Sequence, residues 1–280
     1  SDGQWYQSVA PPAEGYWLAS DGRWYPPSDL SLPGEPWRAS RWGLGDFWWG
    51  MLALAVASLG VGVVIAVAIV ATDPDQSFDT LELGAYAISM SIVANVIAFA
   101  GVPWLATRRK GLRSLAVGFG LRFRSIDVPI GVGVGVAGLV LAAVVGTLID
   151  RALDAPEATS NVPIEDFANA GEFIAFFVAV AIVTPIIEEL FYRGLVYRSF
   201  LKRGTSVPRS VVLTTLVFVV PHLLAVPEWP GILSLFCSIA VLGAALNMAC
   251  VWTGNRLSAP IIAHMVVNGT AVVALYVGAI

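Results

Sequence analysis

The chain has 280 residues, of which 57% are hydrophobic and only 13% are charged. A soluble domain carries about 25% charged residues, and the mean hydropathy of +0.75 is correspondingly high for one. The net charge of -4 is small, so no nucleic-acid partner is expected. These values argue against a soluble enzyme and favour a polytopic protein of the cell membrane.

The first residues, 1–41, form a separate region that is rich in Trp, Pro, Gly and Ser and has no continuous apolar face. The motif Ser-Asp-Gly-x-Trp-Tyr occurs in it twice, at residues 1–6 and 20–25. Asp-Gly favours a tight turn and Trp-Tyr favours strands. We therefore expect a small hairpin-like module or a tether, followed by a transmembrane domain over residues 42–280.

Seven apolar segments after this region are long enough to cross about 30 Å of hydrocarbon. They run over 47–72, 84–106, 128–149, 173–197, 209–226, 231–252 and 258–279. The sequence thus predicts an all-α polytopic membrane protein with about seven transmembrane helices, surrounded by membrane lipid.

The charges between these segments are asymmetric. Basic residues follow the second, fourth and sixth segments, for example Arg108 and Arg109, whereas acidic residues such as Asp73 follow the first. The positive-inside rule therefore places the amino terminus in the cytoplasm and the carboxyl terminus outside. Tryptophans at the predicted cytoplasmic boundaries are expected to anchor the helices in the interface. These are Trp42, Trp48, Trp49, Trp104 and Trp252.

The third apolar segment contains a pattern of small residues. Residues 133–138 fit the dinucleotide-binding fingerprint, but that motif needs a strand before it and a helix after it. Here it lies within a membrane span. We expect Gly131 and Gly135 instead to let two membrane helices approach closely, and Asn95 and Asn247 to form hydrogen bonds between helices.

Ionisable groups are costly in hydrocarbon, so those inside apolar segments are candidates for a functional site. The adjacent Glu188 and Glu189 point about 100° apart on a helix, and Glu189 and Arg193 have the i, i+4 spacing of an ion pair. Glu188 is then left for chemistry. In a structural alternative, all three residues form a buried ion network that only fixes helix packing.

Both histidines of the chain also lie in apolar segments. Phe218 and His222 share a helix face in the fifth segment, and His264 and Asn268 share one in the seventh. Either histidine alone could simply hydrogen-bond a neighbouring helix. However, Glu188 and both histidines lie at a similar depth, roughly 12 to 20 Å from the predicted cytoplasmic boundary. We therefore expect these groups to meet in one water-activating site.

Three motifs occur in a fixed order: Glu-Glu-x-x-x-Arg at 188–193, Phe-x-x-x-His at 218–222 and His-x-x-x-Asn at 264–268. This combination resembles the CPBP family of intramembrane proteases, which contains the type II CAAX prenyl endopeptidases and the bacterial Abi-type proteins. The resemblance covers about residues 80–279. It implies a helical membrane protease whose catalytic residues line a cavity open to the cytoplasm.

Peptide hydrolysis requires a water, a base that activates it and donors for the oxyanion. Glu188 is the expected base, and His222 is expected to hold the same water or to share its proton. The resemblance implies that His264 and Asn268 stabilise the oxyanion. The residues expected to support the site or bind substrate are Glu189, Arg193 and Phe218.

A metal-free glutamate protease and a metalloprotease are both compatible with these motifs. A zinc ion would take Glu188, His222 and His264 as ligands and a water as the fourth. The sequence contains no His-Glu-x-x-His helix of the zincin kind. We favour the metal-free form because a direct role of His264 and Asn268 needs no cation. The expected substrate is a peptide or a membrane-protein tail.

Two other classes of function compete with a protease. In a non-catalytic membrane scaffold or bacteriocin-immunity protein, the polar cluster would only hold helices together. In a transporter, Glu188 and the histidines would form a proton relay. The motifs all lie in the fourth to seventh segments, and no paired, interrupted helices occur in two halves, which argues against transport.

Overall fold

The structure is a computed structural model of the chain, and it describes residues 17–18, 24–25, 36–72, 92–153, 167, 169–225 and 229–278. Strands β1 (Trp17–Leu18) and β2 (Trp24–Tyr25) pair antiparallel, with Trp17 opposite Tyr25. This pairing involves the Trp-Tyr of the second copy of the repeat, and the module or tether expected over residues 1–41 stays a prediction. The first copy and both Asp-Gly turns lie outside the described residues.

The described residues contain five helices that are long and apolar enough to cross a membrane. They are α1 (Leu44–Thr72), α5 (Asp127–Ala152), a continuous helix over 170–202, α10 (Trp229–Trp252) and α11 (Ser258–Tyr276). The predicted fifth span is a shorter apolar helix, Val207–Leu223. The predicted second span is described only from residue 92 onward. The all-α polytopic membrane fold is therefore confirmed, and the described residues contain five full-length spans and one shorter apolar helix of the seven expected.

The helix over 170–202 changes its geometry several times. It consists of α6 (Ala170–Phe177), η4 (Val178–Val183), α7 (Thr184–Glu189), η5 (Leu190–Tyr197) and α8 (Arg198–Lys202), of which η4 and η5 are π-helical. The remaining helices are η1 (Pro36–Ala39), η3 (Val96–Gly101), α3 (Val102–Lys110), α4 (Leu115–Phe119), α9 (Val207–Val219) and η6 (Val220–Ala225).

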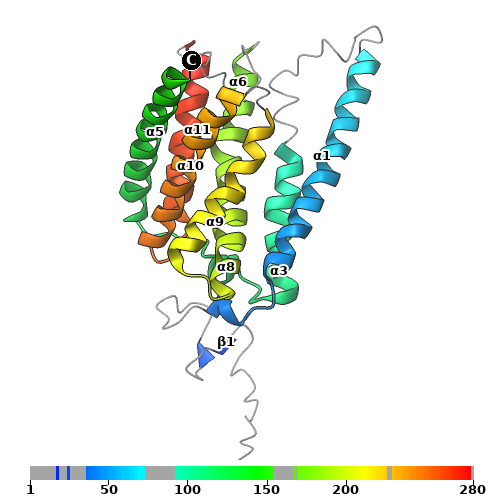
Figure 1. Cartoon of the computed structure of the whole chain (residues 1–280). Helices are drawn as coiled ribbons and strands as arrows, with labels where there is room; N and C mark the ends of the chain where they lie inside the picture. The colour runs from blue at the N-terminus through cyan, green and yellow to red at the C-terminus, as the bar shows by residue number, and fades with distance from the viewer. Residues whose placement is uncertain are drawn as a thin grey trace, which may run out of the picture.

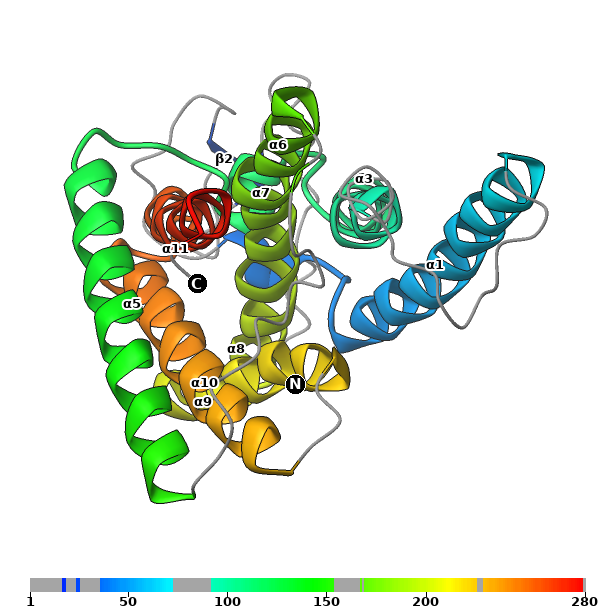
Figure 2. The same cartoon turned by 90° about the horizontal axis from the view of Figure 1, so that it is seen from above.

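The helices form a bundle with one outlying member. Helices α5, α10 and α11 pack together at one edge, and α1 stands at the opposite edge beside α3 (Figure 1 and Figure 2). Much of the surface of α1 is apolar and exposed, as at Leu59 and Val56. The motif-bearing helices therefore form a core to which α1 is added from outside.

The close approach of α5 to α11 depends on two glycines. A Cβ atom at Gly131 would lie 2.7 Å from the carbonyl oxygen of Ala259, and one at Gly135 would lie 2.7 Å from that of Ala263. These distances are shorter than van der Waals contact, so a larger residue would push α11 away. The packing role expected for both glycines is confirmed, and it holds in place the helix that carries His264.

The segment before α1 packs against the end of the bundle. The Trp42 ring is 1% exposed and lies 4.6 Å from the ring of Phe119. The Lys202 ammonium donates to the carbonyl of Ser40 at 2.6 Å and to that of Trp42. The expectation that Trp42 anchors the helix in the lipid interface is therefore wrong, because protein groups enclose this ring. The other expected anchors are exposed: Trp48, Trp49, Trp104 and Trp252.

Candidate active site

The first motif lies on α7, between the two π-helical stretches. Pro185, in the first turn of α7, has no N–H and so removes one helical hydrogen bond. Such π-helical turns inside α-helices occur frequently at functional sites. The side chain of Glu189 is 0% exposed and that of Glu188 is 12% exposed. The adjacent acids thus occupy different environments, as their 100° separation predicts.

Glu189 joins its own helix to α11 through one carboxylate oxygen, and Arg193 extends this connection to α10. Its Oε1 accepts hydrogen bonds from Arg193 Nη1 at 2.9 Å and from His264 Nδ1 at 3.0 Å. Arg193 Nη2 donates to the carbonyl of Gly243 at 3.0 Å, and the guanidinium lies 4.6 Å from the centre of the Phe218 ring. A buried ion pair needs such additional partners to offset its desolvation. The pair expected from the i, i+4 spacing is therefore present and extends into a wider network.

His264 lies between the two carboxylates. Because a carboxylate only accepts, His264 Nδ1 carries the hydrogen that is donated to Glu189. His264 Nε2 then lies 3.9 Å from Glu188 Oε2. This distance is too long for a direct hydrogen bond, but one water can bond to both atoms. The His264 side chain is 7% exposed, so this gap is almost closed to solvent.

His222 lies where α9 narrows into the 3-10 helix η6. Pro221 in that turn has no N–H and cannot continue the α-helical bonding. His222 Nδ1 is 2.9 Å from the carbonyl oxygen of Phe218, so Nδ1 carries the hydrogen and the neutral ring keeps Nε2 as an acceptor. The Phe218 ring contacts both histidines, with centroid distances of 4.9 Å to His222 and 6.0 Å to His264. Phe218 packs beside His222 as expected.

The three expected zinc ligands are not gathered around one point in this structure, and zinc binding by them stays a prediction. Among the described residues, no three His, Cys, Asp or Glu side chains are close enough to share an ion. Glu188 and His264 approach to 3.9 Å, whereas His222 directs Nδ1 to a backbone carbonyl. A catalytic zinc site needs three protein ligands around one point.

Asn268 lies one turn after His264 on α11 and contacts the π-helical stretch η4. Its Nδ2 donates to the carbonyl of Val180 at 2.9 Å. In this stretch the N–H of Thr184 bonds to the carbonyl of Ala179, five residues back. The next carbonyl, that of Val180, would pair with residue 185, which is a proline. Asn268 thus donates the hydrogen bond that Pro185 cannot donate. Its side-chain amide has a second hydrogen that can donate to an oxyanion, and this expected role stays a prediction.

Asn247 extends the network on α10. Its Nδ2 donates to Thr215 Oγ1 on α9 and to the carbonyl of Gly243, both at 3.0 Å. The first bond confirms the hydrogen bond between helices expected from an asparagine in an apolar segment. The carbonyl of Gly243 also accepts from Arg193, and sequence reasoning missed this link. A backbone acceptor has no side-chain signal, so only the Asn247 end could have been identified.

Comparison with known proteins gives a family-model match over the part of the chain that carries the three motifs. Residues 170–270 match the family model described as Type II CAAX prenyl endopeptidase Rce1-like. The matched segment is shorter than the expected 80–279 but contains all three motifs. Neither a curated protein nor a solved structure matches the chain. With its several apolar membrane-length helices, the chain is a multi-pass membrane protein, and its residues 170–270 are similar to the CAAX-protease family model, as the resemblance of the three motifs predicts.

Proposed function

We propose that this chain is an intramembrane endopeptidase that hydrolyses peptide bonds near the cytoplasmic face by means of a water activated by Glu188, without a metal. The observation that carries the proposal is the gap of 3.9 Å between Glu188 Oε2 and His264 Nε2, in a cluster that also contains a buried ion pair. Of the two adjacent glutamates, Glu189 forms the ion pair with Arg193, so Glu188 is the one proposed to take part in the reaction. A general base must lie within hydrogen-bond reach of the water it activates.

In the first step, Glu188 takes a proton from the water while the water oxygen attacks the carbonyl carbon of the scissile peptide. A C–O bond forms and the carbonyl electrons move to oxygen as an oxyanion. Glu188 then delivers the proton to the amide nitrogen as the C–N bond breaks. The acceptor His222 Nε2 is the expected second contact of the water, and this part of the proposal rests on the orientation of its ring.

His264 and Asn268 are the proposed oxyanion donors. Because His264 Nδ1 already donates to Glu189, Nε2 can donate to an oxyanion only when the ring carries hydrogen on both nitrogens. The neutral ring would instead present Nε2 to the water as an acceptor. In both forms, Glu189 positions the imidazole, and Arg193 and Phe218 hold Glu189 and the ring in place.

The substrate is proposed to be a peptide or the tail of a membrane protein, presented within membrane lipid. A substrate-independent experiment compares the termini of membrane proteins, by mass spectrometry, in cells that express the wild type or Glu188→Gln. New termini are expected only with the wild type. Glu172→Gln is the matched control, because Glu172 is buried in the same helix about 24 Å away along the axis. Equal termini from the wild type and Glu188→Gln would refute the protease.

The second candidate is a non-catalytic scaffold or immunity protein. The buried contacts of Glu189 with Arg193 and His264 favour it, since they would fix helix packing even without any reaction. In that case Glu188→Gln would leave both the protein termini and the cellular phenotype unchanged, whereas disruption of the Glu189 contacts would unfold the protein.

A further inference from the structure

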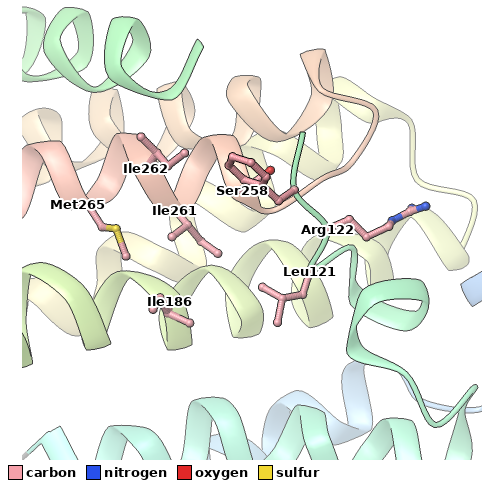
Figure 3. A pocket seen from close by; sticks show the side chains of 8 residues that line it. Leu121, Arg122, Ile186, Ser258, Ile261, Ile262 and Met265 are labelled. Atoms are coloured by element: carbon pink, nitrogen blue, oxygen red, sulfur yellow. The ribbon is translucent and has the colours of Figure 1, made fainter. Parts of the chain in front are cut away.

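A cavity away from the proposed catalytic residues lies between α7, α11 and the segment that follows α4. Its volume is about 320 Å³, and its walls are mostly apolar, with Leu121, Ile186 and Ile261 among them. Figure 3 shows Met265 at one end of this cavity and Arg122 at the other. The cavity therefore combines a long apolar wall with a cation at its end.

The cavity runs along one face of α11. Ser258, Ile261, Ile262 and Met265 all line it, and their i, i+3, i+4, i+7 spacing places them in one stripe. From Ser258, the first residue of α11, to Met265 the helix rises about 10 Å. The cavity thus extends from the end of the helix into the depth that hydrocarbon occupies, which is the shape that an acyl chain fills.

The charged end of the cavity is electropositive. Asp127 is buried and accepts from Arg256 Nη2 at 2.5 Å, from Arg256 Nε at 3.0 Å and from the hydroxyl of Ser258. The backbone N–H of Arg124 also donates to Asp127, at 3.0 Å. Arg256 pairs with this carboxylate, and the guanidinium groups of Arg122 and Arg124 lie near Arg256, so this end of the cavity carries more positive than negative charge.

Arg122 is the cation that this carboxylate does not neutralise. Burial, with repulsion from Arg256 and Arg124, lowers the pKa of Arg122. Its Nε is buried and has no hydrogen-bond partner among the described residues. An anion at the end of the cavity would offset this repulsion. The neighbouring Phe123 and Ile126 are 65% and 55% exposed, which suits a loop that lies in the membrane interface.

We propose that this cavity binds one anionic phospholipid of the cytoplasmic leaflet, with an acyl chain along α11 and the phosphate at Arg122. Anionic lipids are enriched in that leaflet and are attracted by basic groups at its surface. The site goes beyond the proposed protease activity and does not depend on it, because none of the proposed catalytic residues lines the cavity.

Lipid binding to the purified full chain can be measured by native mass spectrometry. The probes are phosphatidylglycerol and phosphatidylcholine with identical acyl chains. We expect phosphatidylglycerol to bind about fivefold more tightly, the factor for one basic residue at a membrane surface. Arg122→Gln should abolish this preference and Arg122→Lys should retain most of it. Arg109→Gln, which changes an exposed arginine on α3 away from the cavity, is the matched control and should retain it fully.

Filling the cavity provides a second test that does not alter its charge. Leu121→Trp should weaken the binding of both lipids, because the indole would occupy the space of the acyl chain. Equal affinity for the two lipids, or equal effects of Arg122→Gln and Arg109→Gln, would overturn the proposal. So would glycerol phosphate binding as tightly as the lipid, or an apolar peptide with a free carboxylate displacing it, which would assign the cavity to a soluble anion or to the substrate.

Discussion

Glu189 Oε1 lies 3.0 Å from His264 Nδ1, so the fully buried acid of the Glu-Glu pair orients the imidazole, while the slightly exposed Glu188 faces the other ring nitrogen. The two nitrogens of His264 thus face different carboxylates. Changes at Glu189 should therefore affect both the stability of the network and cleavage, whereas changes at Glu188 should affect cleavage alone.

The Glu189–Arg193 pair provides the first test. Glu189→Leu would leave Arg193 buried and uncompensated, which typically costs about 3–5 kcal/mol. The double variant Glu189→Leu/Arg193→Met should recover most of the free energy of unfolding, measured by denaturation in detergent, because an apolar pair of similar volume replaces the ions. We expect cleavage to be lost in both variants. A double variant that cleaves normally would show that the network only fixes packing.

Asn268 can be assigned to structure or to catalysis with the help of Pro185. Asn268→Ala should cost about 1–3 kcal/mol, because the carbonyl of Val180 is left without a donor. Adding Pro185→Ala gives residue 185 an N–H for that carbonyl, so the double variant should recover thermal stability. If Asn268 also stabilises the oxyanion, turnover stays about 100-fold low in the double variant. Recovery of turnover together with stability would rule that role out.

The contact between α5 and α11 should be sensitive at Gly135 and insensitive at Gly133. Gly135→Leu is expected to destabilise by at least about 1–3 kcal/mol, because its side chain would overlap α11. Gly133 has no atoms within 4 Å of its Cβ position, so Gly133→Ala should stabilise the helix by up to about 1 kcal/mol. Thermal unfolding of both variants checks this, and equal effects would contradict the packing.

Metal dependence separates the two protease mechanisms. We expect cleavage by the purified chain to survive prolonged treatment with a strong chelator, because the proposed water is activated by Glu188 alone. Elemental analysis of the same sample should find less than one transition-metal ion per chain. Loss of cleavage on chelation, with recovery on addition of zinc, would instead establish a metalloprotease.

The sequence predicted the helical membrane fold well because long apolar runs have few alternatives in a bilayer. It also predicted the Glu189–Arg193 pair, since i, i+4 spacing on one helix determines the contact. It could not predict that Glu189 rather than Glu188 bonds to His264, because this depends on the rotation of one helix against another. Trp42 was misassigned for a related reason: a tryptophan at a boundary has the same local pattern whether lipid or Phe119 covers it.

The effects of two prolines could be predicted only in part. Pro185 and Pro221 are visible in the sequence, and each predicts a local break in helical bonding. Whether the break becomes a π-helical stretch or a 3-10 turn depends on packing against other helices. The π-helical stretch before Pro185 leaves a carbonyl for Asn268, and the 3-10 turn at Pro221 carries His222. Neither the register of the first nor the turn type of the second follows from residue types alone.

Lys202 ends the helix that carries Glu188, and its ammonium holds the carbonyls of Ser40 and Trp42. Ser40 and Trp42, which precede α1, are thus hydrogen-bonded to the motif-bearing helix itself. The contact lies about 21 Å along the helix axis from Glu188. A displacement of Ser40 or Trp42 would therefore act on this helix directly, without passing through α1. The segment just before α1 is therefore attached by hydrogen bonds to the proposed catalytic helix, as well as by the chain to the first span.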